Sequence, residues 1–420
     1  MRSAASGRLS SRRWAIFGAT VLIAACGSGV ASHSTQTPAT SETAVATTIS
    51  ATSSSTSAST STSTAGTVAQ SSLPPSDGPA AKLVAADLPS TGPCNLGSPP
   101  TDGQTTFVVA GRLYALDADG NVQCLADLEG RSPTWLAWSP DGDEVLVGPD
   151  TLLQADGTFS TTGYFADNTN VEWSAPTGKA LIAPKAATGQ LIWRNAHDPT
   201  DRIDVSFADG ITSAAYHPAG KHIVAAGIGR DGLGAGVFVA TNRGGNPQRI
   251  GALEPGSTAT EVAFDMSGDS VVFVHQHADG SSHVHRYVFA TSALLTLADL
   301  PDTTPTHLTV SPVDDGDIAW TETHSTVNSS AHVLVNDAST DVLANSPDGE
   351  HLSDPIGWLP GHRLLVEVRP VGSPSPAPFD LWEWSPTGMT EVIAGVTAAA
   401  TRTVHGPYDE LTIIPGSGFG

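Results

Sequence analysis

One hairpin pattern recurs along most of the chain, and this recurrence restricts the fold more than any other feature of the sequence. Its clearest copy, residues 135–147, is an alternating strand, the turn Ser139-Pro140-Asp141-Gly142 and an apolar strand. Pro fixes φ at about −65° and Gly permits a positive φ, so this turn suits a β-hairpin. Five weaker copies follow, and the residues at one shared position lie 35 to 48 apart: Trp138, Trp173, Tyr216, Phe264, Val310 and Trp358.

A second type of hairpin lies between the copies of the first, with seven copies against six. No stretch shows a sustained helical period, so the pattern predicts an all-β chain of repeated sheets. The unmatched copy is at the amino end, and an apolar strand at about 410–414 supplies its missing partner. The seven copies begin near Leu113, Leu152, Leu191, Val237, His285, His332 and Leu381.

These counts predict a β-propeller of four-stranded blades, with seven blades favoured and six as the alternative. Three amino-terminal strands within residues 105–126 would pair with the carboxyl-terminal strand at about 410–414. Such pairing is expected because a closed ring leaves only short, protected strand edges.

The turn Ser139-Pro140-Asp141-Gly142 after Trp138, followed by an apolar strand, resembles the turns of TolB-type and WD-repeat propellers. The resemblance covers residues 100–420 and implies a binding platform that uses one face of the ring or its central channel. TolB-type propellers are often six-bladed, which keeps six blades as the alternative. We expect the recurring aromatic residues to pack between blades.

The first 25 residues have the pattern of an export signal. Four Arg residues precede an apolar run, residues 14–25, which is too short to span a bilayer. The run ends in Leu22-Ile23-Ala24-Ala25-Cys26, which resembles the lipobox of a bacterial lipoprotein. The resemblance implies a lipid on Cys26. We therefore expect a lipid-anchored protein on the extracytoplasmic face of the cell membrane; the alternative is an ordinary signal with an incidental Cys.

Residues 26–93 are predicted to form a disordered tether, and residues 94–420 the propeller domain. Ser and Thr make up 25 of the 43 residues between 31 and 73, which is too polar a stretch to offset the entropy of ordering. Cys94 and Cys124 are the only other Cys residues. An exported chain favours a disulfide between them over two unpaired buried thiols.

The chain is strongly acidic, with 42 acidic and 19 basic residues. Removal of residues 1–25 takes away four Arg and no acid, which leaves 15 basic residues and a net charge of −27. Such a surface excludes unaided nucleic-acid binding, which needs basic residues to neutralise phosphates. We expect membrane contact through the lipid on Cys26, and a protein or glycan partner in the envelope.

Four His residues at 275, 277, 283 and 285 are the strongest candidates for a ligand site. If residues 278–282 form a loop, His277 lies opposite His283 and His275 opposite His285, all on one face. Neutral imidazoles in this arrangement suit Zn²⁺, Cu²⁺ or Ni²⁺. The alternatives are a solvated hairpin tip and His residues packed between blades.

The sequence lacks the motifs GxSxG and HExxH, and we assign no catalytic residue. The favoured function is a binding or scaffold module that needs no cofactor. The alternative is a metal-dependent enzyme or sensor, with its site in the propeller channel or at the His275–His285 hairpin.

A lipid on Cys26 can be tested with globomycin, an inhibitor of the lipoprotein signal peptidase, which should make the uncleaved precursor accumulate. Cys26→Ser should also move the chain out of the membrane fraction, because the acyl chains that hold it there are lost. Immunoblots of membrane and soluble fractions measure both effects, with Cys94→Ser as the control. Processing that is unaffected by globomycin would identify an ordinary secretory signal.

Overall fold

The chain divides into two compact units, residues 1–71 and 72–420, and every described residue belongs to the second. Cys26, the predicted signal and the apolar segment at 410–414 lie outside the described residues. Among the described residues, no helix has the length and apolar character needed to cross a membrane. The computed structural model describes residues 82–97, 99–100, 103–161, 171–174, 180–185, 189–198, 200–205, 207–229, 234–314, 316–325, 328–335, 338–341, 351–370, 373 and 378–404.

The described residues form 28 strands, which group into seven four-stranded blades. The last two blades are joined by one parallel pair, Ser329 with Leu352. Blade 1 contains β1 (Gln104–Val109), β2 (Arg112–Leu116), β3 (Val122–Asp127) and β28 (Ala398–Arg402); blade 2 contains β4 (Leu136–Trp138), β5 (Val145–Val147), β6 (Thr151–Leu153) and β7 (Phe159–Thr161); blade 3 contains β8 (Glu172–Trp173), β9 (Ala180–Lys185), β10 (Gln190–Asn195) and β11 (Arg202–Val205); blade 4 contains β12 (Ala208–Tyr216), β13 (His222–Gly229), β14 (Gly234–Thr241) and β15 (Gln248–Ala252); blade 5 contains β16 (Thr258–Phe264), β17 (Ser270–Gln276), β18 (Ser282–Val288) and β19 (Ala293–Leu300); blade 6 contains β20 (Thr306–Val310), β21 (Ile318–Ser325), β22 (Asn328–Val335) and β23 (Ala338–Asp341); blade 7 contains β24 (His351–Leu359), β25 (Arg363–Pro370), β26 (Phe379–Ser385) and β27 (Gly388–Val396).

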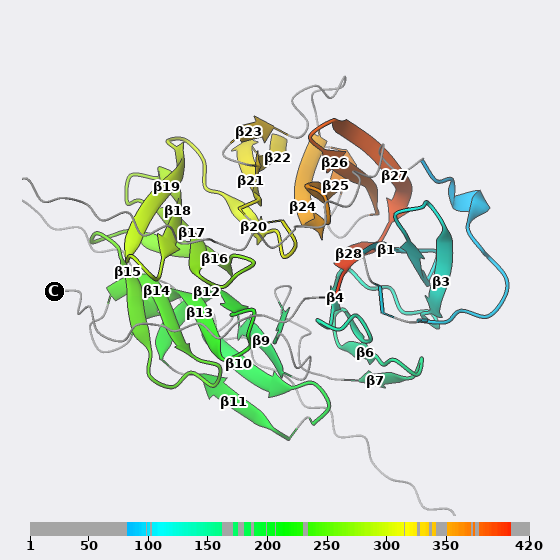
Figure 1. The fold of residues 1–420 in the computed structure, drawn as a ribbon, viewed down its shortest axis with the longest axis horizontal. Helices are drawn as coiled ribbons and strands as arrows, with labels where there is room; N and C mark the ends of the chain where they lie inside the picture. The colour runs from blue at the N-terminus through cyan, green and yellow to red at the C-terminus, as the bar shows by residue number, and fades with distance from the viewer. Residues whose placement is uncertain are drawn as a thin grey trace, which may run out of the picture. The chain divides into compact units, whose positions relative to one another are not determined.

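The innermost strand of each blade, which is β28 in blade 1 and the first strand in each of the others, lies towards a common centre, and the blades follow one another around it (Figure 1). Contacts run from β4 to β8, β12, β16, β20, β24 and β28, and from β28 back to β4. The all-β propeller of seven four-stranded blades is therefore confirmed. Each of the seven predicted second hairpins begins in or next to the third strand of its blade, counted from the centre.

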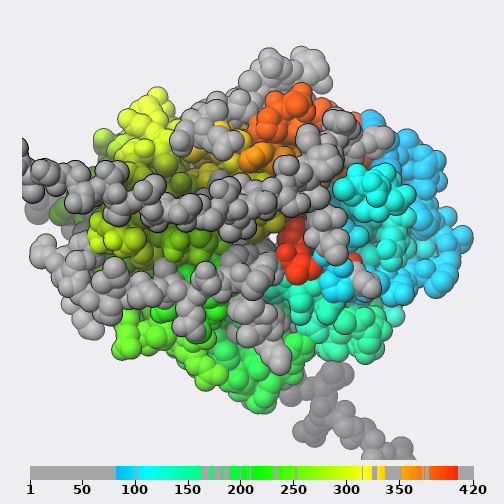
Figure 2. Space-filling model, in the orientation of Figure 1, coloured from blue at the N-terminus to red at the C-terminus, as the bar shows by residue number. Residues whose placement is uncertain are grey.

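The strand that completes blade 1 is not the one predicted. β28, at 398–402, pairs antiparallel with β1, so that Phe107 lies opposite Ala399 and Thr105 opposite Thr401. Figure 2 shows the red atoms of this strand beside the cyan atoms of the amino-terminal blade. The prediction of 410–414 is wrong because it looked for an apolar strand followed by a Pro/Gly turn. The innermost strand lies close to the inner strands β24 and β4 of the adjacent blades, and the small side chains of residues 398–400 can be accommodated between them.

Arg402, the last residue of β28, connects three parts of the chain. Its Nε donates to the Gly142 carbonyl at 2.8 Å, and its Nη1 donates to Leu96 O at 3.1 Å and to Gln104 Oε1 at 3.2 Å. The guanidinium also lies over the ring of Trp138, 4.5 Å from its centroid, and Arg402 is only 1% exposed. One buried cation therefore holds the closing strand to blade 2 and to the segment before blade 1.

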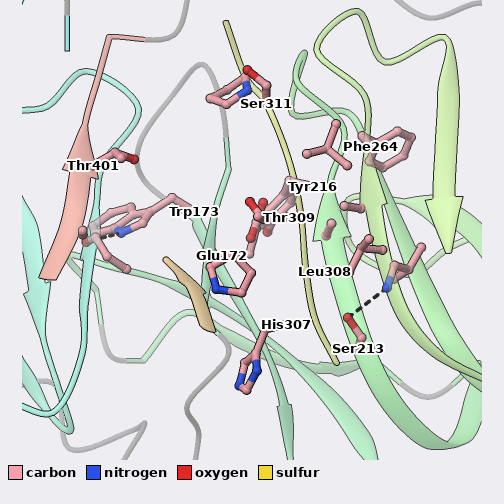
Figure 3. Close-up of a pocket in the computed structure, with 18 of the residues that line it drawn as sticks. Glu172, Trp173, Ser213, Tyr216, Phe264, His307, Leu308, Thr309, Ser311 and Thr401 are labelled. Atoms are coloured by element: carbon pink, nitrogen blue, oxygen red, sulfur yellow. Dashed lines mark hydrogen bonds between the residues drawn. The ribbon is translucent and has the colours of Figure 1, made fainter. Parts of the chain in front are cut away.

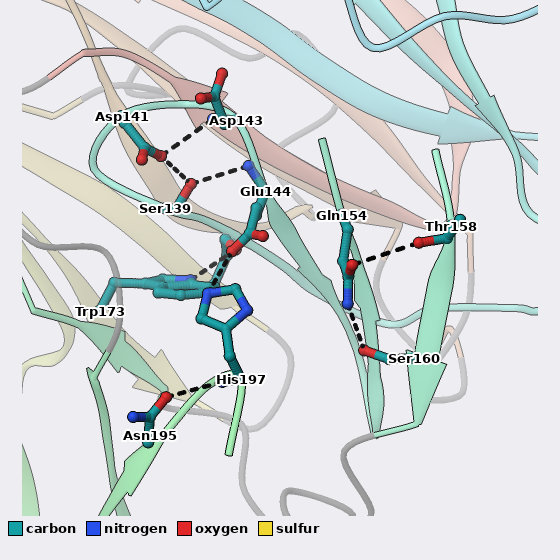
Figure 4. A network of polar contacts seen from close by, with 11 residues as sticks. Ser139, Asp141, Asp143, Glu144, Gln154, Thr158, Ser160, Trp173, Asn195 and His197 are labelled. Carbon is teal, nitrogen blue, oxygen red and sulfur yellow. Dashed lines mark hydrogen bonds and ion pairs between the residues drawn. The ribbon is translucent and has the colours of Figure 1, made fainter. Parts of the chain in front are cut away.

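The recurring aromatic residues pack between blades, as expected. Nε1 of Trp138 donates to Thr106 Oγ1 in blade 1 at 2.9 Å, and Nε1 of Trp173 donates to Ala137 O in blade 2 at 3.0 Å. Figure 4 shows a second polar contact between blades 2 and 3, in which Glu144 and His197 meet at 3.1 Å. Trp138 and Trp173 thus fix blades 2 and 3 to the preceding blade.

The segment before blade 1 packs on the outside of the ring. Lys82 pairs with Glu391, and Leu88 is buried at 6% exposure, although the sequence places both residues within the tether. The predicted disulfide between Cys94 and Cys124 is present and joins this segment to β3. Through these contacts the segment covers the outer part of blade 1, where Leu88 shares a hydrophobic cluster with Tyr114.

Arg402→Met should lower the free energy of unfolding by roughly 2–4 kcal/mol, because the Met keeps the apolar stem and leaves buried carbonyls without their charged donor. Urea denaturation followed by intrinsic Trp fluorescence measures this loss. Arg202→Met is the control, since Arg202 is exposed and pairs with Asp204 on the same strand. Equal losses in the two variants would mean that the Arg402 contacts do not hold the closing strand.

Candidate functional sites

The inner strands enclose a cavity of about 720 Å³ along the axis of the ring. All seven inner strands contribute lining residues, and Figure 3 shows Glu172 and Thr309 between Trp173 on one side and Phe264 on the other. None of the described residues that line this cavity is Lys or Arg. We call this cavity the channel site.

Four neighbouring inner strands carry a shift in register at the level of the channel site; the shifts in β16, β20 and β24 have the one extra residue of a β-bulge, and the shift in β12 has two. The pairing shifts between Asp209 and Ser213 in β12, between Ala259 and Val262 in β16, between Thr306 and Thr309 in β20, and between Pro355 and Gly357 in β24. A bulge redirects the side chain of the extra residue, and bulges are common beside functional sites.

Two of these bulges contain the ionisable residues Glu261 and His307, which line the cavity. His307 has a φ of 53°, a value that a residue with a side chain adopts at an energetic cost. Nδ1 of His307 lies 3.4 Å from Asp354 Oδ1, and Thr321 Oγ1 donates to the same oxygen at 2.8 Å. The hydrogen bond to Asp354 raises the pKa of His307, and the charges of Asp354 and Glu261 add to this effect against the opposing burial.

Glu172 and Glu261 are two acids in the channel site with strongly altered ionisation. The enclosure of each carboxyl by the ring raises its pKa to about 7. The Glu172 carboxyl is open to the space of the channel, while the blades still surround it. The positive charge of His307 lowers the pKa of Glu261 but does not cancel the effect of burial. The described lining of the channel site therefore contains these two carboxyl groups and no Lys or Arg.

The four predicted His residues meet on one face of the β17–β18 hairpin, and we call them the His cluster. The pairing differs from expectation by two residues: His275 lies opposite His283, and Phe273 lies opposite His285. A turn closed by the His277 N–H and Ser281 O makes the loop shorter than predicted. Because the difference is an even number of residues, the side chains still share one face.

The imidazole nitrogens of the His cluster are close together. His277 Nε2 and His283 Nδ1 are 2.9 Å apart, and His275 Nδ1 and His285 Nε2 are 3.4 Å apart. Glu254, which precedes β16, contacts His277 Nδ1 and lies 3.5 Å from His275 Nε2. Burial and the charges of nearby His residues together lower the pKa of His285 to about 4, and burial also lowers the pKa of His275.

Sequence reasoning placed the His cluster on one face but missed the acids of the channel site. Each missed residue precedes the aromatic or apolar anchor of its inner strand by one to four positions. Because this offset varies and no residue type repeats at it, no pattern in the sequence marks these residues. They are Glu172, Glu261, His307 and Asp354, which precede Trp173, Phe264, Val310 and Trp358.

No protein-family model and no curated protein matches the sequence. Similar solved structures include TolB from Acinetobacter baumannii, at 13% identity and TM-score 0.41 over 72% of this chain and 82% of that chain. Oligogalacturonate lyase from Vibrio parahaemolyticus has 13% identity and TM-score 0.45 over 65% and 89%. Hydrazine synthase from Kuenenia stuttgartiensis has 13% identity and TM-score 0.46 over 60% and 76%. The strand pairing itself identifies the chain as a seven-bladed β-propeller.

Glu172→Gln and Glu261→Gln should each raise Tm at pH 8 and change it little at pH 5. The ordinary pKa of Glu is 4.5, and the folded value is about 7 for both residues. Between these values the folded state binds the extra proton, so wild-type stability falls as the pH rises through about 7. Gln has no such proton to lose. Differential scanning fluorimetry from pH 5 to 8 measures the change.

Glu129→Gln provides the control for this experiment, because the Glu129 side chain is 67% exposed and far from the cavity lining. A shift in Tm that is the same at pH 5 and pH 8 in the channel variants would contradict the assigned pKa values.

Proposed function

We propose that this protein is a lipid-anchored binding module of the cell envelope, which holds part of an extracytoplasmic protein or glycan in the channel site. The observation that supports it most is the convergence of Glu172, Glu261 and His307 on one cavity at the centre of the ring, with Asp354 behind His307 at 3.4 Å. Ligand sites in proteins are commonly concave, mostly apolar and supplied with a few convergent polar groups.

The charge of the channel site favours a ligand that carries a cationic group. Two enclosed carboxyl groups with raised pKa values become more stable as carboxylates when an ammonium or guanidinium lies beside them. The apolar part of the lining, with Trp173 and Phe264, can contact the aliphatic stem of such a group. Between the two partner classes, a protein segment with Lys or Arg therefore fits better than a neutral glycan.

The anchor and the tether would determine where this binding takes place. The lipid on Cys26 would hold the chain at the membrane, and the Ser/Thr-rich tether would extend the propeller away from it. As a flexible coil, residues 27–81, which precede the segment packed on the ring, would span roughly 40 Å. The acidic propeller would then present its channel to partners in the envelope rather than to the anionic lipid surface.

A channel enzyme is the second candidate, and the His307–Asp354 pair beside Glu261 favours it. Groups with pKa values displaced towards neutrality are suited to general acid–base catalysis near pH 7. The two candidates differ in the fate of the partner, which a binding module leaves intact and an enzyme converts.

Site-specific crosslinking in intact cells tests the proposal. A photoreactive amino acid replaces Thr401, which lines the cavity, or Leu294, which is 51% exposed on β19 of blade 5. We expect a discrete adduct from position 401 and not from position 294. The pair Glu172→Gln and Glu261→Gln should reduce that adduct by about fivefold or more, since a cationic group loses both of its carboxylates.

Glu129→Gln in the same background should leave the adduct unchanged. Mass spectrometry of the adduct identifies the captured group and shows whether it is intact or converted. A channel adduct that is insensitive to the two Glu substitutions, or equal labelling from position 294, would contradict a partner held by the channel carboxylates.

A further inference from the structure

The His cluster is a built arrangement of nitrogen donors and not a solvated hairpin tip. His275 and His285 are each only 5% exposed. β19 covers the cluster on one side, where Thr296 Oγ1 lies 3.3 Å from His285 Nδ1 and Asp299 lies 3.2 Å from His283 Nε2. The connection before β16 covers it on another side through Glu254.

The spacing of the nitrogens matches the coordination sphere of a first-row metal ion. Tetrahedral sites with bonds of about 2.0–2.1 Å place neighbouring ligand nitrogens about 3.4 Å apart. His275 Nδ1 and His285 Nε2 are 3.4 Å apart, and His283 Nδ1 lies 2.9 Å from Nε2 of the neighbouring His277. One ligand atom from each of His275, His283 and His285 lies within 4.8 Å of the other two, so small side-chain movements bring all three to one ion.

The surroundings of the cluster leave donor capacity unused. His275 Nε2 is buried and makes no hydrogen bond within the described part of the chain. Each neutral imidazole has one nitrogen lone pair. When two imidazoles form a hydrogen bond, the lone pair of the acceptor ring is used and that of the donor ring stays available to a metal ion. Glu254, His275 and His277 form a second set of donors that shares His275 with the first, and it adds a carboxylate beside the nitrogens.

We propose that the β17–β18 hairpin binds one divalent transition-metal ion of the Zn²⁺, Cu²⁺ or Ni²⁺ kind through His275, His283 and His285. His277 Nε2, which lies 2.9 Å from His283 Nδ1, borders the remaining coordination position, and Glu254 contacts His277 Nδ1 and orients that ring. The donors are imidazoles and one carboxylate, which suits these ions better than Ca²⁺ or Mg²⁺, whose ligands are oxygens. The site stands on its own contacts and does not depend on the proposed function of the channel.

Isothermal titration calorimetry of the mature full-length chain with ZnCl₂, CuCl₂ and NiCl₂ tests this proposal after treatment with a chelator. We expect one equivalent of metal to bind with saturable heat for at least one of these ions, and the same ion to raise Tm. CaCl₂ and MgCl₂ should give neither effect. His283→Ala/His285→Ala should abolish the saturable heat, because two of the three ligands are lost.

His197→Ala is the matched control, since His197 is a partly exposed His in another blade and should leave metal binding unchanged. If the double variant does not fold, as judged by its Tm without metal, His283→Gln replaces it, because the His283 side chain is 28% exposed. His283→Gln should weaken binding by about tenfold or more. Heat in wild type no larger than in the ligand variants would overturn the metal site.

Discussion

The pairing of β28 with β1 is the constraint on which the rest of this structure depends. Without its innermost strand, blade 1 would have unpaired backbone N–H and C=O groups along β1, and the channel would be open at that blade. Here a strand from the end of the described chain, 398–402, fills that place. Arg402 then adds charged hydrogen bonds to Leu96 and Gly142, so one buried side chain connects the closing strand to residues about 300 and 260 positions away.

Closure also creates the electrostatic character of the channel. Seven inner strands bring side chains from distant parts of the sequence into one enclosed space, and bulges in β16 and β20 direct Glu261 and His307 there. The ring surrounds the carboxyl groups of Glu172 and Glu261, and this raises the pKa of each to about 7; no Lys or Arg is present among the described lining residues. The same ring that stabilises the fold therefore holds the two carboxyl groups where their ionised form is disfavoured. A cationic ligand beside them would stabilise that ionised form.

The sequence was most informative where the relevant contacts are local. Hairpin turns with Pro and Gly and the recurrent aromatic positions predicted the blades and their packing. The His cluster was also predictable in outline, since alternation along two strands joined by a short loop decides which side chains share a face. The loop length was wrong by two residues, and the prediction of a shared face survived only because this difference is even.

The sequence by itself determined the repeated all-β architecture through local turn chemistry and periodicity. It favoured seven blades over six and a Cys94–Cys124 disulfide over two free thiols, and the structure decided both in that sense. Only the tertiary structure decided which strand completes blade 1 and which acids meet in the channel. Small residues such as those of Ala398–Ala400 carry no periodic signal of their own. Glu172, Glu261 and Asp354 are separated by 89 and 93 positions, and only the closed ring brings these acids to the same central region.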